Sequence, residues 1–293
     1  MSRKLNFICI GAQKAATTTL HDALKKHSLI YLPEEKEAKF FEEEMIYDKG
    51  YEKWYKENYS KAKFNQIIGL VNPELLFFSE SAKRIKNEIG IGVKIIIVLR
   101  NPVDRAYSHF LMTKRRGLED LSFEKALKQE SSRSIKDNIF YKKHFSYIGR
   151  GRYFDQIQNY LKYFDEKNFL FLSYEEDIKK NLKRTLIKIQ KFLNISIEPL
   201  DFSQYSNIAK TPRIFMINKL IFAKNKYLNF FVSLFLSKKQ KKKFVKIIYN
   251  FNSKKILNNS IDISTKKNIM NKYFEKDYNK TLKFISENGY GSK

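Results

Sequence analysis

Residues 7–20 read Phe-Ile-Cys-Ile-Gly-Ala-Gln-Lys-Ala-Ala-Thr-Thr-Thr-Leu, which predicts a strand, a tight turn and a helix in succession. Its first four residues are apolar, as in a buried strand, and Gly11 then allows the backbone to turn tightly. The apolar spacing from Leu20 to Leu24 predicts a helix that begins near Thr17. One lysine, three threonines and the free N–H groups of the helix start therefore converge on one point, which favours an anion.

Two other interpretations of this stretch are weaker. A buried strand followed by an ordinary threonine-capped helix occurs in every α/β domain, but a lysine inside the tight loop between them usually serves phosphate. The nucleotide-triphosphate loop reads Gly-x-x-x-x-Gly-Lys-Ser/Thr. Here Ala16 and Thr17 replace its second glycine and its lysine, and no obvious set of magnesium ligands is present. The pattern therefore points away from kinases and nucleotide triphosphatases.

A second strand-to-helix junction follows the β-branched run over residues 94–99, which is typical of a central parallel strand. Asn101 as helix cap and Pro102 at the first helical position start the next helix. Arg100 lies at the start of that helix, and the side chain of Ser108 tilts back toward it. We expect a second anion site at this junction.

Between the two junctions, the charged segment from Pro33 to Phe41 ends in an aromatic pair. Within it, Glu37 lies between Lys36 and Lys39. Because nearby cations favour the charged form of a carboxyl group, Glu37 is expected to be ionised and ready to accept a proton. For the neighbouring glutamates, a solvated charge run is the better explanation.

Together, these three stretches resemble the sulfotransferases that use 3′-phosphoadenosine 5′-phosphosulfate (PAPS), in the branch that includes the heparan sulfate sulfotransferases and their bacterial relatives. The first is similar to the loop that binds the 5′-phosphosulfate, and the segment around Glu37 to the one that carries the catalytic base. The junction at Arg100 is similar to the segment that binds the 3′-phosphate. The resemblance covers roughly residues 5 to 215.

The resemblance implies a role for each matched residue. Glu37 would be the catalytic base, and Lys14 would neutralise charge on the departing nucleotide phosphate. The residues implied for the 5′-phosphosulfate are Gln13, Lys14, Ala15, Ala16, Thr17, Thr18 and Thr19. Those implied for the rest of the nucleotide are Arg100 and Ser108 at the 3′-phosphate, with Lys210 and Arg213 in a loop that covers the cofactor in relatives.

The implied reaction moves the sulfuryl group of PAPS to a hydroxyl or amine of a carbohydrate-type acceptor, without a metal. One departure concerns the acceptor side of the pocket. Many relatives carry Glu and then Lys or Ser before the proline after the next strand, where this chain has Leu70, Val71 and Asn72.

The resemblance implies a P-loop-like α/β fold, with a three-layer domain whose central parallel sheet is flanked by helices, plus a helical C-terminal extension. A change in the character of the sequence near residue 200 sets a soft domain boundary. It separates a PAPS-binding domain (1–200) from a cofactor-covering loop and basic helical extension (201–293). We expect these parts to form one compact unit.

The chain of 293 residues carries 57 Lys plus Arg against 31 Asp plus Glu, a formal net charge of +26. This charge suits a polyanionic partner, although the abundance of lysine, asparagine, isoleucine and phenylalanine would also follow from an AT-rich genome. The single cysteine, Cys9, is expected to pack in the core, which favours a reducing compartment. The four scattered histidines indicate no metal site.

The chain runs from Met-Ser-Arg-Lys directly into the first predicted strand, which leaves no room for a secretory signal and predicts a cytoplasmic location. Residues 227–237 are uncharged but too short to span a bilayer, and lysines follow them. They predict either a helix packed on the domain or an interfacial helix on the anionic inner face of the membrane.

The expected acceptor is a hydroxyl of a glycan or glycolipid, and no nucleic-acid partner is expected. The alternatives are a non-enzymatic basic protein that binds nucleic acid or a membrane surface, and a nucleotide kinase, which would need magnesium and ATP. The sequence leaves the acceptor and the oligomeric state open.

Overall fold

The structure is a computed structural model that describes residues 3–134, 138–201, 210–212, 248, 253–255 and 261–288. The chain divides into two compact units, each assembled from separate segments. The first comprises residues 1–105, 148–205 and 267–293, and the second comprises residues 106–147 and 206–266. The boundary near residue 200 stays a prediction.

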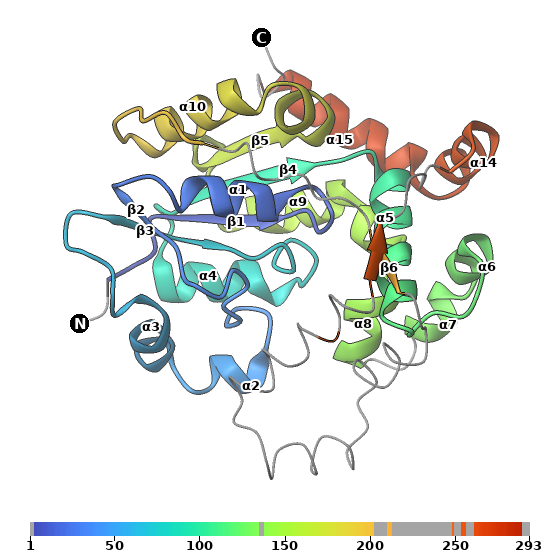
Figure 1. Ribbon diagram of the computed structural model, residues 1–293, viewed down its shortest axis with the longest axis horizontal. Coiled ribbons are helices and arrows are strands. Elements are labelled where there is room, and N and C mark those ends of the chain that lie inside the picture. The colour runs from blue at the N-terminus through green and yellow to red at the C-terminus, as the bar shows by residue number, and fades with distance from the viewer. Residues whose placement is uncertain are drawn as a thin grey trace. The chain divides into compact units, whose positions relative to one another are not determined.

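Five parallel strands form the centre of the first unit, in the order β2-β3-β1-β4-β5 (Figure 1). Their bounds are Phe7–Gly11 for β1, Ile30–Tyr31 for β2, Ile67–Val71 for β3, Lys94–Leu99 for β4 and Phe169–Ser173 for β5. All of β1 is buried, including Cys9, as expected for a run that is apolar throughout. The sheet confirms the predicted fold class.

Helices cover both faces of this sheet (Figure 1). Helix α1 (Thr17–Leu24) leads from β1 to β2, and α4 (Glu80–Ile89) leads from β3 to β4 in the opposite direction across the sheet. Because such crossovers are right-handed, the two helices lie on opposite faces. Other described helices of this unit are α2 (Glu44–Tyr47), α3 (Tyr51–Tyr59), η1 (Gly149–Gly151), α9 (Tyr153–Leu161), η2 (Glu166–Asn168), η3 (Tyr174–Lys180) and α10 (Leu182–Leu193).

The last helices of the chain are α14 (Ile263–Ile269), η4 (Met270–Phe274) and α15 (Glu275–Glu287). Helix α15 belongs to the first unit and packs against β5 and α9. The ring of Phe284 lies 6.0 Å from that of Phe171 on β5, and Asp277 accepts a hydrogen bond from the N–H of Phe154 at 3.3 Å. The C-terminal helix therefore contributes to the core of this unit.

An aromatic cluster fixes the segment that follows β2. The ring of Phe40 stacks on Trp54 with centroids 4.9 Å apart, and Phe41 meets the same indole edge-on at 5.9 Å. Trp54 is 4% exposed, so it is a core residue and not a platform for sugar. This packing anchors the C-terminal end of the segment that carries Glu37.

The second unit begins within α5 (Pro102–Arg115), which starts in the first unit. Its other described elements are α6 (Phe123–Lys128), α7 (Glu130–Ser134), α8 (Ile139–Phe145) and an antiparallel pair of short strands, β6 (Lys210–Pro212) and β7 (Ser253–Lys255). None of the described helices is both long and apolar enough to cross a membrane. Residues 227–237, predicted as either a helix packed on the domain or an interfacial helix, lie outside the described part of the chain.

A buried carboxylate ties the second unit together. Glu119 accepts hydrogen bonds from the Arg133 guanidinium at 2.5 and 3.1 Å, from the Tyr147 hydroxyl at 3.0 Å and from the N–H of Leu121 at 3.2 Å. Burial alone would raise the pKa of Glu119, but these hydrogen bonds and the Arg133 charge outweigh burial and lower it. The Glu119–Arg133 pair therefore contributes stability in its ionised form.

Replacing Arg133 by methionine is expected to cost about 3 kcal/mol at pH 7, because it leaves a buried carboxylate without its cation. Because the pKa of Glu119 is lower in the folded state than in the unfolded state, the stability that the ion pair contributes is present above the unfolded-state pKa. It is lost as pH falls through the folded-state pKa. The difference from wild type should therefore shrink on acidification. Urea unfolding between pH 7 and pH 3 measures it, and a constant difference would contradict the assignment.

The matched control is Lys180→Met, because Lys180 forms an exposed ion pair with Glu176 at 2.7 Å. Such surface pairs contribute about 1 kcal/mol or less. We therefore expect a small change from this variant across the whole pH range.

Candidate active site

The candidate site lies in the first unit, at the end of the sheet formed by the carboxyl ends of its parallel strands. Strands β3 and β2 lie on one side of β1, and β4 and β5 lie on the other. The order in which strands are added to the sheet therefore changes direction between β1 and β4. Open α/β sheets bind their ligands at such a switch point, beyond the carboxyl ends of the strands. The loop of residues 11–16 follows β1, and Arg100 follows β4, so both predicted anion motifs lie at this point.

The loop after β1 has the backbone of an anion-binding nest. Lys14 has a φ of 71° and Ala16 a φ of 61°, both in the left-handed region, while Ala15 between them does not. When left-handed and right-handed backbone conformations alternate, successive N–H groups turn toward one point. Left-handed non-glycine residues cost roughly 1–3 kcal/mol each and cluster at functional sites. The geometry therefore supports the anion site that was predicted for this loop.

Helix α1 begins at Thr17, as predicted, and Ala16 is its N-cap. The alanine has no side chain that could cap the helix, and the first turn contains no acidic residue. The positive end of the helix dipole is thus left for an anion. Thr17 and Thr19 are buried and Thr18 is exposed, and all three belong to this first turn.

Arg100 is fixed against the same loop. Its Nη1 donates a hydrogen bond to the carbonyl oxygen of Lys14 at 2.8 Å, and its guanidinium lies 4.5 Å from the ring centre of Tyr174 after β5. The hydroxyl of Tyr153 donates to the carbonyl oxygen of Arg100 at 2.9 Å. The structure therefore brings together the two motifs that the sequence predicted separately.

The other residues predicted for the nucleotide are placed less completely. Asn101 caps α5 as predicted, since its Oδ1 accepts hydrogen bonds from two backbone N–H groups at 3.1 and 3.2 Å. Ser108 lies on α5 within the second unit, so its contact with the nucleotide stays a prediction. Lys210 lies in β6, and Arg213 lies outside the described residues.

Glu37 lies in a turn after β2, and its side chain is 45% exposed. The Lys36 ammonium is 3.1 Å from its Oε1. Burial raises the pKa of Cys9 in β1 to about 11, and the Lys36 charge partly opposes this rise. The second predicted lysine, Lys39, instead pairs with Glu43 at 3.1 Å.

A buried polar network that the sequence analysis did not assign lies between these loops. The Asn72 amide donates to Glu42 at 2.8 Å and accepts from the N–H of Glu74 at 3.1 Å. Glu74 in turn accepts from the Gln13 amide at 2.8 Å. The available signal was a pair of polar residues, Asn72 and Glu74, on either side of a proline directly after a buried strand. Asn72 is fully buried, as are the two apolar residues before it that depart from the family pattern.

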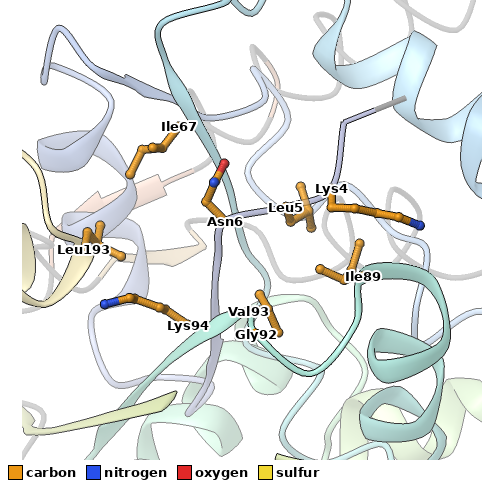
Figure 2. A pocket seen from close by; sticks show the side chains of 9 residues that line it. All are labelled: Lys4, Leu5, Asn6, Ile67, Ile89, Gly92, Val93, Lys94 and Leu193. Carbon is orange, nitrogen blue, oxygen red and sulfur yellow. The ribbon is translucent and has the colours of Figure 1, made fainter. Parts of the chain in front are cut away.

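Within the described residues, no three His, Cys, Asp or Glu side chains are grouped so that they could hold a metal ion. A cavity of about 330 Å³ lies elsewhere, at the end of the sheet where the parallel strands begin. Figure 2 shows the side chains that line it. It is lined by residues 4–6 before β1, by Ile67 at the start of β3 and by residues 92–94 at the start of β4. It is therefore not part of the candidate active site.

The chain matches the family model of the sulfotransferase domain over residues 6–243, and it therefore belongs to the sulfotransferase family. Members of this family are transferases, and use of PAPS is typical of them. The chain is 27% identical to heparan sulfate glucosamine 3-O-sulfotransferase 6 of Mus musculus over 205 residues, which is 69% of this chain and 56% of that protein.

The chain is also 33% identical to the membrane-associated sulfotransferase kil1 of Dictyostelium discoideum over 108 residues, which is 36% of this chain and 22% of that protein. It spans about half the length of the heparan sulfate sulfotransferases that it matches. A solved sulfotransferase from Alicyclobacillus acidocaldarius has a TM-score of 0.59 and 26% identity, over 70% of this chain and 87% of that chain. This similarity confirms the P-loop-like fold.

Proposed function

We propose that this protein transfers the sulfuryl group of PAPS to a hydroxyl or amine of a carbohydrate-type acceptor and releases adenosine 3′,5′-bisphosphate. The observation that carries the proposal is the hydrogen bond between Arg100 and the carbonyl oxygen of Lys14, which joins two anion motifs at one switch point. A nucleotide with phosphates at both its 3′ and 5′ positions offers a separate anion to each motif.

The 5′-phosphosulfate would occupy the nest of residues 13–16, where backbone N–H groups and the hydroxyls at the start of α1 hold it. Sulfuryl transfer, like phosphoryl transfer, has a loose in-line transition state, so the protein mainly positions the reactants and stabilises charge. Lys14 would neutralise the charge that develops on the bridging oxygen as its bond to sulfur breaks. Arg100 and Ser108 would bind the 3′-phosphate. No metal ion enters this scheme.

Glu37 would take the proton of the acceptor hydroxyl as its oxygen attacks sulfur. Its exposure leaves it accessible to a substrate. Glu42, another carboxylate near this loop, is 5% exposed and accepts hydrogen bonds from Asn72 and from the N–H of Phe40. Burial and these contacts make Glu42 unsuitable as the base.

The proposed acceptor is a glycan or glycolipid. The support for it is the glucosamine 3-O-sulfotransferase activity named for the relatives and the formal charge of +26, which suits an anionic polymer. A cytoplasmic location, with a peripheral contact at the anionic inner face of the membrane, belongs to the same proposal.

Sulfur-35-labelled PAPS tests the proposal when it is incubated with the protein and an extract of the source cells. We expect label in carbohydrate-containing material, and calorimetric binding of adenosine 3′,5′-bisphosphate in the absence of magnesium. Salt-dependent binding to DNA or lipid without any nucleotide binding would overturn the proposal in favour of the non-enzymatic alternative.

Arg100→Ala is expected to weaken the binding of adenosine 3′,5′-bisphosphate by about 10- to 100-fold, because it removes charge-assisted hydrogen bonds to the 3′-phosphate. Binding of adenosine 5′-monophosphate, which lacks that group, should weaken less, because it loses only the support that Arg100 gives to the carbonyl oxygen of Lys14. Calorimetry with both nucleotides measures the contrast. Equal losses for the two ligands would contradict the assignment.

Arg84→Ala is the matched control for this experiment. The Arg84 guanidinium also lies over a tyrosine ring, 4.7 Å from the centre of Tyr47, and donates to a backbone carbonyl, that of Phe41, at 3.2 Å. It lies in α4 and belongs to neither anion motif. We expect this variant to bind both nucleotides as the wild type does.

A further inference from the structure

The side chain that precedes Lys14 in the anion-binding loop is bonded outside that loop. Gln13 donates from Nε2 to Glu74 Oε1 at 2.8 Å, across the edge of the sheet between the loops that follow β1 and β3. The next residue, Lys14, is in the left-handed region. A strained conformation persists only where its surroundings hold it, and this contact acts directly beside the strained residue.

Glu74 is well suited to hold Gln13. Its residue is 8% exposed, and its second oxygen accepts a hydrogen bond from Arg150 at 2.6 Å. Arg150 is 3% exposed and lies 4.5 Å from the ring centre of Phe77. An uncompensated buried carboxylate beside an anion site would repel the ligand, and the guanidinium neutralises it. The pair thus provides a rigid acceptor with no net charge.

The position of Glu74 is itself set by the sheet. Its N–H donates to Asn72 Oδ1 at 3.1 Å, and the N–H of Asn72 donates to the carbonyl oxygen of Cys9 in β1 at 3.0 Å. The Gln13 amide can turn only its NH₂ toward a carboxylate, because the flipped amide would bring two oxygens together. The contact therefore fixes one orientation of Gln13 relative to the end of β1.

We propose that Glu74 is a positioning residue that acts through Gln13 to hold residues 13–16 in the conformation that binds the 5′-phosphosulfate. Arg150 keeps this arrangement neutral, and Glu74 itself does not touch the nucleotide. The inference rests on the proposed function, since it names what holds the loop of that same site.

Gln13→Ala is the first test, with calorimetric titration of adenosine 3′,5′-bisphosphate and of adenosine 3′-monophosphate. We expect the bisphosphate to bind about 10-fold or more weakly, because its 5′-phosphate depends on the loop, a difference of about 1.4 kcal/mol. The 3′-monophosphate should bind as it does to the wild type. A merely structural role of Gln13 would weaken both nucleotides alike.

Gln66→Ala is the matched control, because the Gln66 amide is likewise held by hydrogen bonds, to Ser28 and from Lys63, each at 3.0 Å. It lies just before β3, at the edge of the sheet opposite the site. Neither nucleotide should lose affinity in this variant.

A double-mutant cycle separates positioning from direct contact of Gln13 with the nucleotide. Glu74→Leu combined with Arg150→Met removes the acceptor and its counter-charge together, so that no buried charge is left unpaired. We expect this pair of changes to give the same selective loss, and Gln13→Ala to add nothing further in that background.

The outcomes are distinguishable. Additive losses in the cycle, or equal weakening of both nucleotides by Gln13→Ala, would overturn the positioning role and leave the proposed function standing. Failure of the wild type to bind either nucleotide would overturn both.

Discussion

Lys14→Ala is expected to lower the rate of sulfuryl transfer by about two to four orders of magnitude while the protein still folds. The ammonium group would stabilise charge that develops only as the bond between sulfur and the bridging oxygen breaks. Its loss should therefore affect turnover more than nucleotide binding. Alanine leaves the backbone with the same left-handed conformational cost that lysine has at a φ of 71°, so the variant isolates the ammonium.

Single-turnover kinetics with labelled PAPS measure this effect, with Lys25→Ala as the control. Lys25 forms an ion pair with the exposed Glu34 at 2.8 Å and belongs to neither anion motif. The control removes one positive charge from the same region of the chain and should keep full activity. Full activity of Lys14→Ala itself would remove the role assigned to Lys14.

Glu37→Gln should also reduce turnover by about two to four orders of magnitude, because the amide cannot accept the acceptor's proton. The substitution keeps the volume of the side chain and its oxygen near Lys36, so the loop should retain its structure. Binding of adenosine 3′,5′-bisphosphate should be unchanged, since the base contacts the acceptor and not the nucleotide. Turnover under saturating PAPS and calorimetric affinity together measure this separation.

Glu34→Gln is the control for the base, because Glu34 lies in the same segment with its carboxylate on the surface. We expect it to behave as the wild type. If Glu37→Gln turned over at the wild-type rate, or if both variants lost activity equally, Glu37 would not be the base.

Much of the sheet could be predicted because its signals are local. The uninterrupted apolar runs that became β1 and β4 needed burial on both faces, and Gly11 and Asn101 marked where each run ends. The start of α1 at Thr17 followed from apolar spacing in the same way. Lys39 shows the limit of such reasoning, because its neighbour in sequence, Glu37, was the predicted partner and Glu43 is the actual one.

The chemistry of the two anion motifs and their places at strand ends follow from local sequence, because the residues involved are close together along the chain. The hydrogen bonds of Arg100 with Lys14 and of Glu74 with Gln13 and Arg150 depend instead on tertiary structure. These partners are separated by tens of residues. The loops that carry Lys14, Glu74 and Arg100 meet because they follow parallel strands that end together, and Arg150 reaches Glu74 from η1. No pattern within one segment carries that information.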